Sequence, residues 1–186
     1  MMRYNWLFLA GLVLSAPAFS GSGTGTEAVT STETEVSSLF KKTQGIHESF
    51  TNFPLATKLG FKNLFPQVYV VNNKQQVVLL KPNNHSEEIL GGLDQLSKNI
   101  HAFDLPEKTA TSGADYQKLL ALSDKLDLND KSLHQSLLAE EPVIISLGLD
   151  EKLGCEPCNR VQKKLEEHAK ALTAHYKLYH IVVEIQ

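Results

Sequence analysis

The two cysteines of the chain, Cys155 and Cys158, stand between a stretch that predicts a buried strand and one that predicts an amphipathic helix. The strand covers Pro142 to Leu147, where nearly all residues are apolar. A second strand is predicted over Tyr176 to Glu184. Apolar residues at helical spacing mark the buried face of the helix between them: Val161, Leu165, Ala169 and Leu172. The order strand, C-x-x-C, helix, strand predicts an α/β fold in which the cysteine pair opens a helix.

Composition limits what the rest of the chain can be. Its 186 residues leave room for one domain and an arm. With 42% hydrophobic and 21% charged residues, the chain is not disordered as a whole. A net charge of −3 gives no basic surface for phosphate contacts, so no nucleic-acid partner is expected. Two cysteines are too few for a multi-disulfide scaffold or a four-cysteine zinc site.

The N-terminal segment, residues 1–20, has the pattern of a cleaved signal peptide. Arg3 is followed by an apolar run over Leu7 to Leu14 and then by small residues. We therefore expect export to the periplasm, where disulfides persist. Contact with the membrane is expected only if the segment stays uncleaved. Residues 21–38 are mostly Ser, Thr, Gly and Glu, which predicts a flexible arm.

The remaining residues, 39–186, are expected to form one domain. Its first part, 39–101, begins with a weakly helical pattern across Ser37 to Phe61 and a short helix over Pro54 to Leu59. A β-hairpin is predicted from Gln67 to Val71 and from Gln76 to Leu80, with turn residues between the two runs. Ser86 then caps a helix that reaches Ile100.

The second part, residues 102–141, is predicted to connect the hairpin segment to the cysteine segment. Residues 102–114 contain turn-forming residues and are expected to lie on the surface. Two helices should follow, over Tyr116 to Leu126 and Lys131 to Leu138. Residues 142–186 form the third part, which carries the cysteines.

The position of the cysteines at a helix start predicts their chemistry. Backbone N–H groups and the helix dipole stabilise a thiolate at Cys155, which makes it the candidate nucleophile. Cys158 lies one turn further on and can resolve a mixed disulfide formed at Cys155. Pro157 stiffens the turn, and the negative charge of Glu156 opposes thiolate formation. These four residues, with Cys155 and Cys158 as the catalytic pair, are the first candidate site residues.

Two other roles for the cysteine pair stay open at the level of sequence. The pair could be a structural disulfide that only caps the helix. It could also bind a metal together with His168, His175 or His180, but none of these has the spacing of a zinc finger. We expect His175 and His180 to face solvent. Covalent haem is excluded because Asn159, not histidine, follows the second cysteine. No cofactor and no metal site are predicted.

The segment Cys155-Glu156-Pro157-Cys158 after an apolar strand resembles the active site of exported thioredoxin-like thiol–disulfide oxidoreductases. In that family the chain continues with a helix, a cis-proline loop, a hairpin and a closing helix. Here the segments that resemble these parts come earlier, between Leu55 and Ile100. The resemblance therefore implies a circularly permuted thioredoxin-like domain, a three-layer α/β/α sandwich with a central mixed sheet.

The resemblance also implies a role for Phe65 and Pro66. Their peptide bond would be cis, and Pro66 would lie beside Cys155 and position the substrate backbone. Two features depart from the family pattern. Gly154 stands where a tryptophan usually precedes the first cysteine, and no acidic residue lies within Val143 to Leu147.

Two functions follow from these observations. The first is a periplasmic enzyme that exchanges the Cys155–Cys158 disulfide or dithiol with an exported partner protein bearing thiols or a disulfide. The second is a non-enzymatic thioredoxin-like module of a secretion or conjugation apparatus, in which the disulfide is structural. A monomer or a domain-swapped dimer could complete the fold.

Overall fold

The computed structural model describes residues 45–80, 86–102, 113–126 and 131–185. The predicted signal peptide and arm, and most of the predicted surface connection, lie outside these residues. The described part is an α/β protein built on a single mixed sheet of five strands. In spatial order the strands are β1 (Ile46–Asn52), β5 (Lys177–Glu184), β4 (Val143–Leu149), β2 (Gln67–Val71) and β3 (Val77–Leu80).

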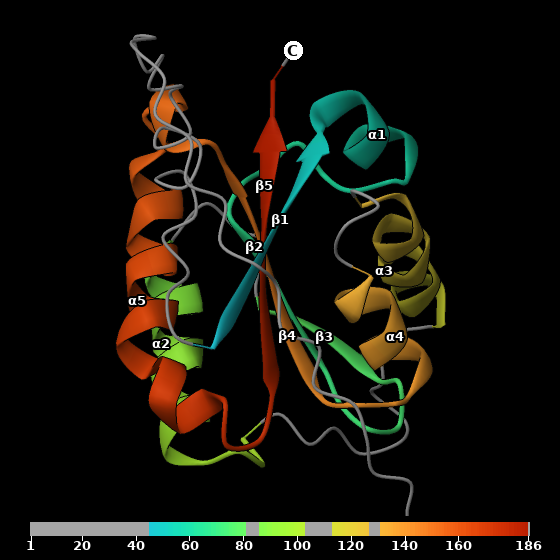
Figure 1. Ribbon diagram of the computed structural model, residues 1–186. Helices are drawn as coiled ribbons and strands as arrows, with labels where there is room; N and C mark the ends of the chain where they lie inside the picture. Colours follow the sequence, from blue (N-terminus) through green and yellow to red (C-terminus); the bar gives the residue numbers. More distant parts are fainter. Residues whose placement is uncertain (1–44, 81–85, 103–112, 127–130, 186) are drawn as a thin grey trace, which may run out of the picture. The chain divides into compact units, whose positions relative to one another are not determined.

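The strand directions divide the sheet into two parts. Strands β1, β5 and β4 are parallel to one another, whereas β2 runs antiparallel to both β4 and β3. The carboxyl ends of the three parallel strands therefore share one edge of the sheet with the amino end of β2. The pairing of Gln67 with Leu147 fixes this alignment. We call this edge the upper edge, after its place in Figure 1.

Helices cover both faces of the sheet (Figure 1). On one face lie α2 (Ser86–Lys98) and α5 (Glu156–Leu172). On the other lie α1 (Phe53–Lys58), α3 (Gly113–Lys125) and α4 (Ser132–Leu138). None of the helices in the described residues is long and apolar enough to span a bilayer.

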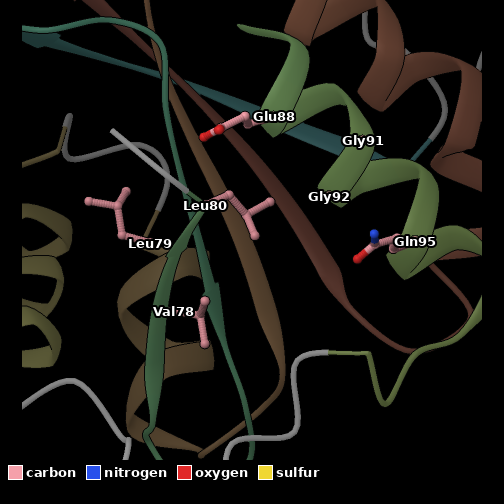
Figure 2. A pocket seen from close by; sticks show the side chains of 7 residues that line it. All are labelled: Val78, Leu79, Leu80, Glu88, Gly91, Gly92 and Gln95. Atoms are coloured by element: carbon pink, nitrogen blue, oxygen red, sulfur yellow. The ribbon is translucent and has the colours of Figure 1, made fainter. Parts of the chain in front are cut away.

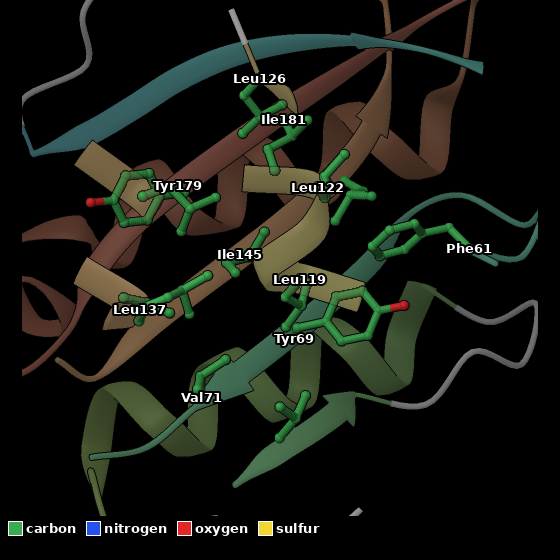
Figure 3. Close-up of a cluster of buried hydrophobic side chains, with 14 of the residues drawn as sticks. Phe61, Tyr69, Val71, Leu119, Leu122, Leu126, Leu137, Ile145, Tyr179 and Ile181 are labelled. Carbon is green, nitrogen blue, oxygen red and sulfur yellow. The ribbon is translucent and has the colours of Figure 1, made fainter. Parts of the chain in front are cut away.

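Successive side chains of the central strands point to opposite faces of the sheet, which gives one hydrophobic core on each face. In β2, Val68 and Val70 face α2 and α5, while Tyr69 and Val71 face α3 and α4. All five residues of β2 are buried, as expected for a strand covered on both faces. Figure 3 shows the second core, in which side chains of the sheet pack against those of the helices, among them Leu119, Leu122, Leu126 and Leu137.

Polar contacts join α2 to α5 along their length. The Asp94 carboxylate lies 2.6 Å from Nε2 of His168 and accepts a bond of 3.1 Å from Nζ of Lys164. Both partners stabilise the charged form and hold the pKa of Asp94 below its ordinary value. Near the helix starts, Arg160 pairs with Glu87. This pair links the second turn of α5 to the first turn of α2.

The helices and the hairpin that the sequence predicts are confirmed, with ends that shift by a few residues. In the hairpin, Oδ1 of Asn72 accepts hydrogen bonds from the backbone N–H groups of Lys74 and Gln76. Strand β4 extends two residues beyond the predicted Leu147, so Gly148 belongs to the sheet and not to the loop.

The weakly helical pattern predicted across Ser37 to Phe61 is wrong for Ile46–Asn52, which form the edge strand β1. This strand is held by parallel pairing with β5, more than a hundred residues away in the chain. Its buried positions include Ser49 and Thr51, so it lacks the apolar alternation that identifies a strand. Distant pairing decides its conformation, and no local pattern reports it.

Truncation of Leu93 tests the core between α2 and the sheet. Leu93 is fully buried, so Leu93→Ala should lower the free energy of unfolding by about 2–5 kcal/mol. The matched control is Leu138→Ala at the end of α4, where the side chain is 59% exposed and the expected change is about 0.5 kcal/mol or less. Urea denaturation followed by circular dichroism measures both. Equal losses would contradict the assigned packing.

Candidate redox site

Cys155 and Cys158 form a disulfide at the upper edge of the sheet, with an S–S distance of 1.99 Å. After β4 the chain makes a short 3-10 turn over Glu151–Leu153, which the side chain of Asp150 caps by accepting a bond from Lys152 N–H. Gly154 ends this turn with a φ of 65°. Cys155 then occupies the N-cap position of α5. The local sequence thus delivers the first sulfur to a helix start.

The two sulfurs have different surroundings. Cys155 is half-buried, and its Sγ accepts a bond of 3.3 Å from the N–H of Cys158. Cys158 is only 3% exposed, and its Sγ lies 3.5 Å from the N–H of Leu149 in β4. The sulfur of the half-buried Cys155 therefore sits at a helix start, where backbone N–H groups favour negative charge, and the sulfur of the buried Cys158 lies against β4.

Glu156 and Pro157 complete the first turn of α5. Both side chains are exposed, and Pro157 falls where a helix leaves an N–H without a partner. An acidic residue in this first turn also interacts favourably with the helix dipole. Glu156 and Pro157 therefore form the exposed surface between the two cysteines.

Phe65 and Pro66 lie at the same edge, just before β2, and are joined by a cis peptide bond. The register of β2 and β4, continued by one residue from Gln67 and Leu147, brings Pro66 opposite Gly148. Cys158 packs on this glycine, since a Cβ built there would lie 3.5 Å from Cβ of Cys158. The Phe65–Pro66 segment therefore leads into the strand next to β4, and Cys158 packs on Gly148 of β4.

Gln67 anchors the loop before Pro66, a role that the sequence analysis missed. Its side chain is 1% exposed, and its amide donates a bond of 2.6 Å to the carbonyl of Lys62. The hydroxyl of Tyr69 donates to the side-chain oxygen of Gln67 over 2.7 Å. Burial raises the pKa of this Tyr69 hydroxyl. A glutamine in an otherwise apolar strand is the sequence signal that could have indicated this anchor.

His180 is buried, which contradicts the prediction that it faces solvent. The side chain is 5% exposed in the centre of β5, and burial lowers its pKa to about 4. It points to the same face as Cys158, since a Cβ built on Gly148 would lie 3.1 Å from its Cε1. The prediction failed because every inner position of β5 is buried, so a polar residue within this strand does not reach solvent. His175, by contrast, is exposed as predicted.

Neighbouring strands complete a polar row around His180. In the sheet register His180 pairs with Ser146 of β4 on one side and with Glu48 of β1 on the other. Burial raises the pKa of Glu48, and the charges of Glu151 and Glu166 add to the effect. Sequence reasoning missed this row because three strands far apart in the chain build it.

The other candidate binding features give no metal centre. His168 contacts Asp94 of α2, and the described residues contain no group of three or more His, Cys, Asp or Glu side chains that could hold a metal ion. A groove of about 510 Å³ lies between the edge strand β3 and α2 (Figure 2). Its lining is mostly apolar and contains neither cysteine: Val78, Leu79, Leu80, Glu88, Gly91, Gly92 and Gln95.

Comparisons of the chain with protein-family models, with curated proteins and with solved structures found no match.

Substitution of Gly154 tests the backbone conformation that leads into Cys155. A Cβ there would meet no atom within 4 Å, so the cost of a side chain comes from the positive φ alone. Gly154→Ala should lower the free energy of unfolding by about 1 kcal/mol, whereas Gly154→Asn should cost less because asparagine tolerates this conformation. Urea titration compares the two variants. A larger loss for asparagine would contradict the explanation.

The buried imidazole of His180 predicts a loss of stability in acid. Its pKa is about 4 in the folded protein against an ordinary 6.5, so between these values the unfolded chain binds the extra proton. The free energy of unfolding should therefore fall as the pH drops from about 6.5 to 4, by about 3 kcal/mol from this group. His180→Gln should lose this part of the pH dependence. Parallel slopes for the two proteins would show that His180 does not titrate as stated.

Proposed function

We propose that the chain is an exported thiol–disulfide oxidoreductase of thioredoxin-like, circularly permuted architecture. The observation that carries the proposal is the asymmetric disulfide at the start of α5. Cys155 is half-buried and its sulfur accepts a bond from an N–H of the first helical turn, whereas Cys158 is buried. A disulfide that serves only as a cap has no need of this difference in access.

The arrangement of the two halves supports the thioredoxin-like part of the proposal. Helix α1, the cis bond before Pro66, the hairpin β2–β3 and helix α2 have the order that the family places after its C-x-x-C unit. Here they precede that unit in the chain and join it in space through the pairing of β2 with β4.

The proposed reaction is a two-step thiol–disulfide exchange. In the dithiol form, the Cys155 thiolate attacks a partner disulfide, forms a mixed disulfide and releases one partner sulfur as a thiolate. Cys158 then loses its proton and attacks Sγ of Cys155. This step forms the Cys155–Cys158 bond and releases the second partner sulfur, which takes up a proton. The partner disulfide is reduced and the dithiol is oxidised; the reverse sequence oxidises a partner dithiol.

Exposed apolar side chains at the upper edge support a polypeptide as the partner. Leu64 precedes the Phe65–Pro66 bond, Leu153 precedes Gly154, and Ile185 follows β5. Their exposed fractions are 47%, 46% and 57%. Such side chains on the rim of a half-buried sulfur fit an extended apolar segment that carries a cysteine. We propose an exported protein as this partner, in the periplasm, where the disulfide form persists.

Trapping with oxidised glutathione tests the assigned roles of the cysteines. After reduction and removal of the reductant, Cys158→Ser should form a stable glutathione adduct at Cys155, because no resolving thiol remains. Cys155→Ser, the matched control, should form the adduct at about one tenth of that rate or more slowly still, because its remaining thiol, Cys158, is buried. The wild type should pass through the adduct to the internal disulfide. Mass spectrometry of acid-quenched samples measures all three.

Equal adduct rates for the two variants would overturn the proposal. A reduction potential below about −300 mV together with an inert Cys155 would instead indicate the structural disulfide of a non-enzymatic module.

A further inference from the structure

His180 is the only buried histidine on the Cys158 side of the sheet within the described residues, and the exchange reaction as described gives it no role. We propose that His180 accepts the proton that Cys158 must lose when it attacks the mixed disulfide at Cys155. The inference rests on the proposed function, because it assigns a residue to its second step.

The absence of a side chain at Gly148 brings His180 and Cys158 to a common space. A Cβ built on Gly148 would lie 3.1 Å from Cε1 and 3.8 Å from Nε2 of His180, and 3.5 Å from Cβ of Cys158. The ring edge that carries Nε2 therefore faces the space that Cys158 also borders. This makes Nε2 the nitrogen that takes the proton.

The surroundings of the ring argue against a purely structural histidine. Nδ1 is buried and has no hydrogen-bond partner, and Oγ of the neighbouring Ser146 has none either. Each such group costs about 1–3 kcal/mol when it is buried without a partner. A histidine that served the core would be held by hydrogen bonds, and a leucine would fill the position at no such cost.

The charge state of His180 fits an acceptor. Burial keeps the imidazole neutral at neutral pH, so Nε2 can have a free lone pair. When Cys158 attacks, its proton passes to His180, its sulfur bonds to Sγ of Cys155, and the partner sulfur leaves as a thiolate. The imidazolium then returns the proton to this thiolate or to solvent. The cation on His180 forms only beside the developing negative charge of the sulfurs, which offsets the cost of its burial.

Three elements pack around His180, and a polar group on any of them could accept the Cys158 proton in its place. Strand β4 presents Ser146, which does not titrate in this range, and α5 presents Cys158 itself. Strand β1 presents Glu48, whose pKa is raised by burial and then by Glu151 and Glu166. Glu48 is therefore the one rival carboxylate in this row, and a variant must separate it from His180.

The test is the pH dependence of the resolution step. Reduced protein is mixed with oxidised glutathione, quenched with acid, and the decay of the Cys155 adduct is followed by mass spectrometry between pH 5 and 9. In His180→Gln the rate should fall about tenfold for each pH unit below the thiol pKa, because only free thiolate reacts. The wild type should fall less steeply and exceed the variant by about a hundredfold at pH 6. The two rates should converge near pH 9.

Two control variants accompany this measurement, one at another histidine and one at the rival carboxylate. His47→Gln changes the histidine of β1 that stacks on Tyr179 across the opposite face of the sheet, and Glu48→Gln removes the rival carboxylate. Both should keep the profile of the wild type. If Glu48→Gln gives the steep profile and His180→Gln does not, Glu48 is the acceptor and the proposal is wrong.

Gly148→Ala tests the same contact with every titratable group retained. Its new Cβ must displace the imidazole, which lies 3.1 Å away, so the profile should steepen as in His180→Gln but to a smaller extent. This variant also keeps the proposal testable if His180→Gln does not fold. A rate lowered equally at all pH values in both variants would indicate a structural role and overturn the proposal.

A double variant distinguishes the failure of this inference from the failure of the proposed function. Cys158→Ser with and without His180→Gln should form the glutathione adduct at the same rate, because His180 is assigned only to the second step. No adduct in either protein would contradict the proposed function. Normal adduct formation with unchanged resolution in His180→Gln would contradict only the role of His180.

Discussion

The antiparallel pairing of β2 with β4 is the interaction on which the rest of the structure depends. It joins the hairpin and α2, from the first part of the chain, to the strand, helix and strand that carry the cysteines. The same register, continued by one residue, puts Pro66 opposite Gly148. Cys158 of the disulfide packs on this glycine. Without the pairing of β2 with β4 the chain would hold two half-sheets, each with an exposed apolar edge.

In the site, one cysteine is held against the sheet and the other is bordered by exposed residues. Beneath the disulfide, Cys158 packs on Gly148 and its sulfur lies near a backbone N–H of β4, so the second sulfur is held by the sheet itself. Above it, Cys155 is bordered by exposed residues of α5 and of the preceding turn. We propose that this combination lets a partner reach one sulfur while the buried sulfur, with His180 beside it, completes the exchange.

Local sequence patterns predicted most of the elements, because each helix has its own apolar stripe and the hairpin its own turn. Strand β1 could not be found in this way, since its conformation depends on β5 and its buried residues include Ser49 and Thr51. The placement of His180 failed for a related reason. A strand covered on both faces shows no alternation, so the sequence does not reveal which face a residue occupies. Its proximity to Cys158 follows only from the register of β5 with β4.

The order of strands has a consequence for how the protein is made. Among the described strands β5 is made after all the others, yet it lies between β1 and β4 and takes part in both parallel pairs of these strands. A nascent chain that lacks it can form the hairpin and its pairing with β4, but β1 has no neighbour to bind. The cysteines, in contrast, are three residues apart and precede β5. The disulfide can therefore close locally before the sheet exists, and completion of the fold waits for the final strand.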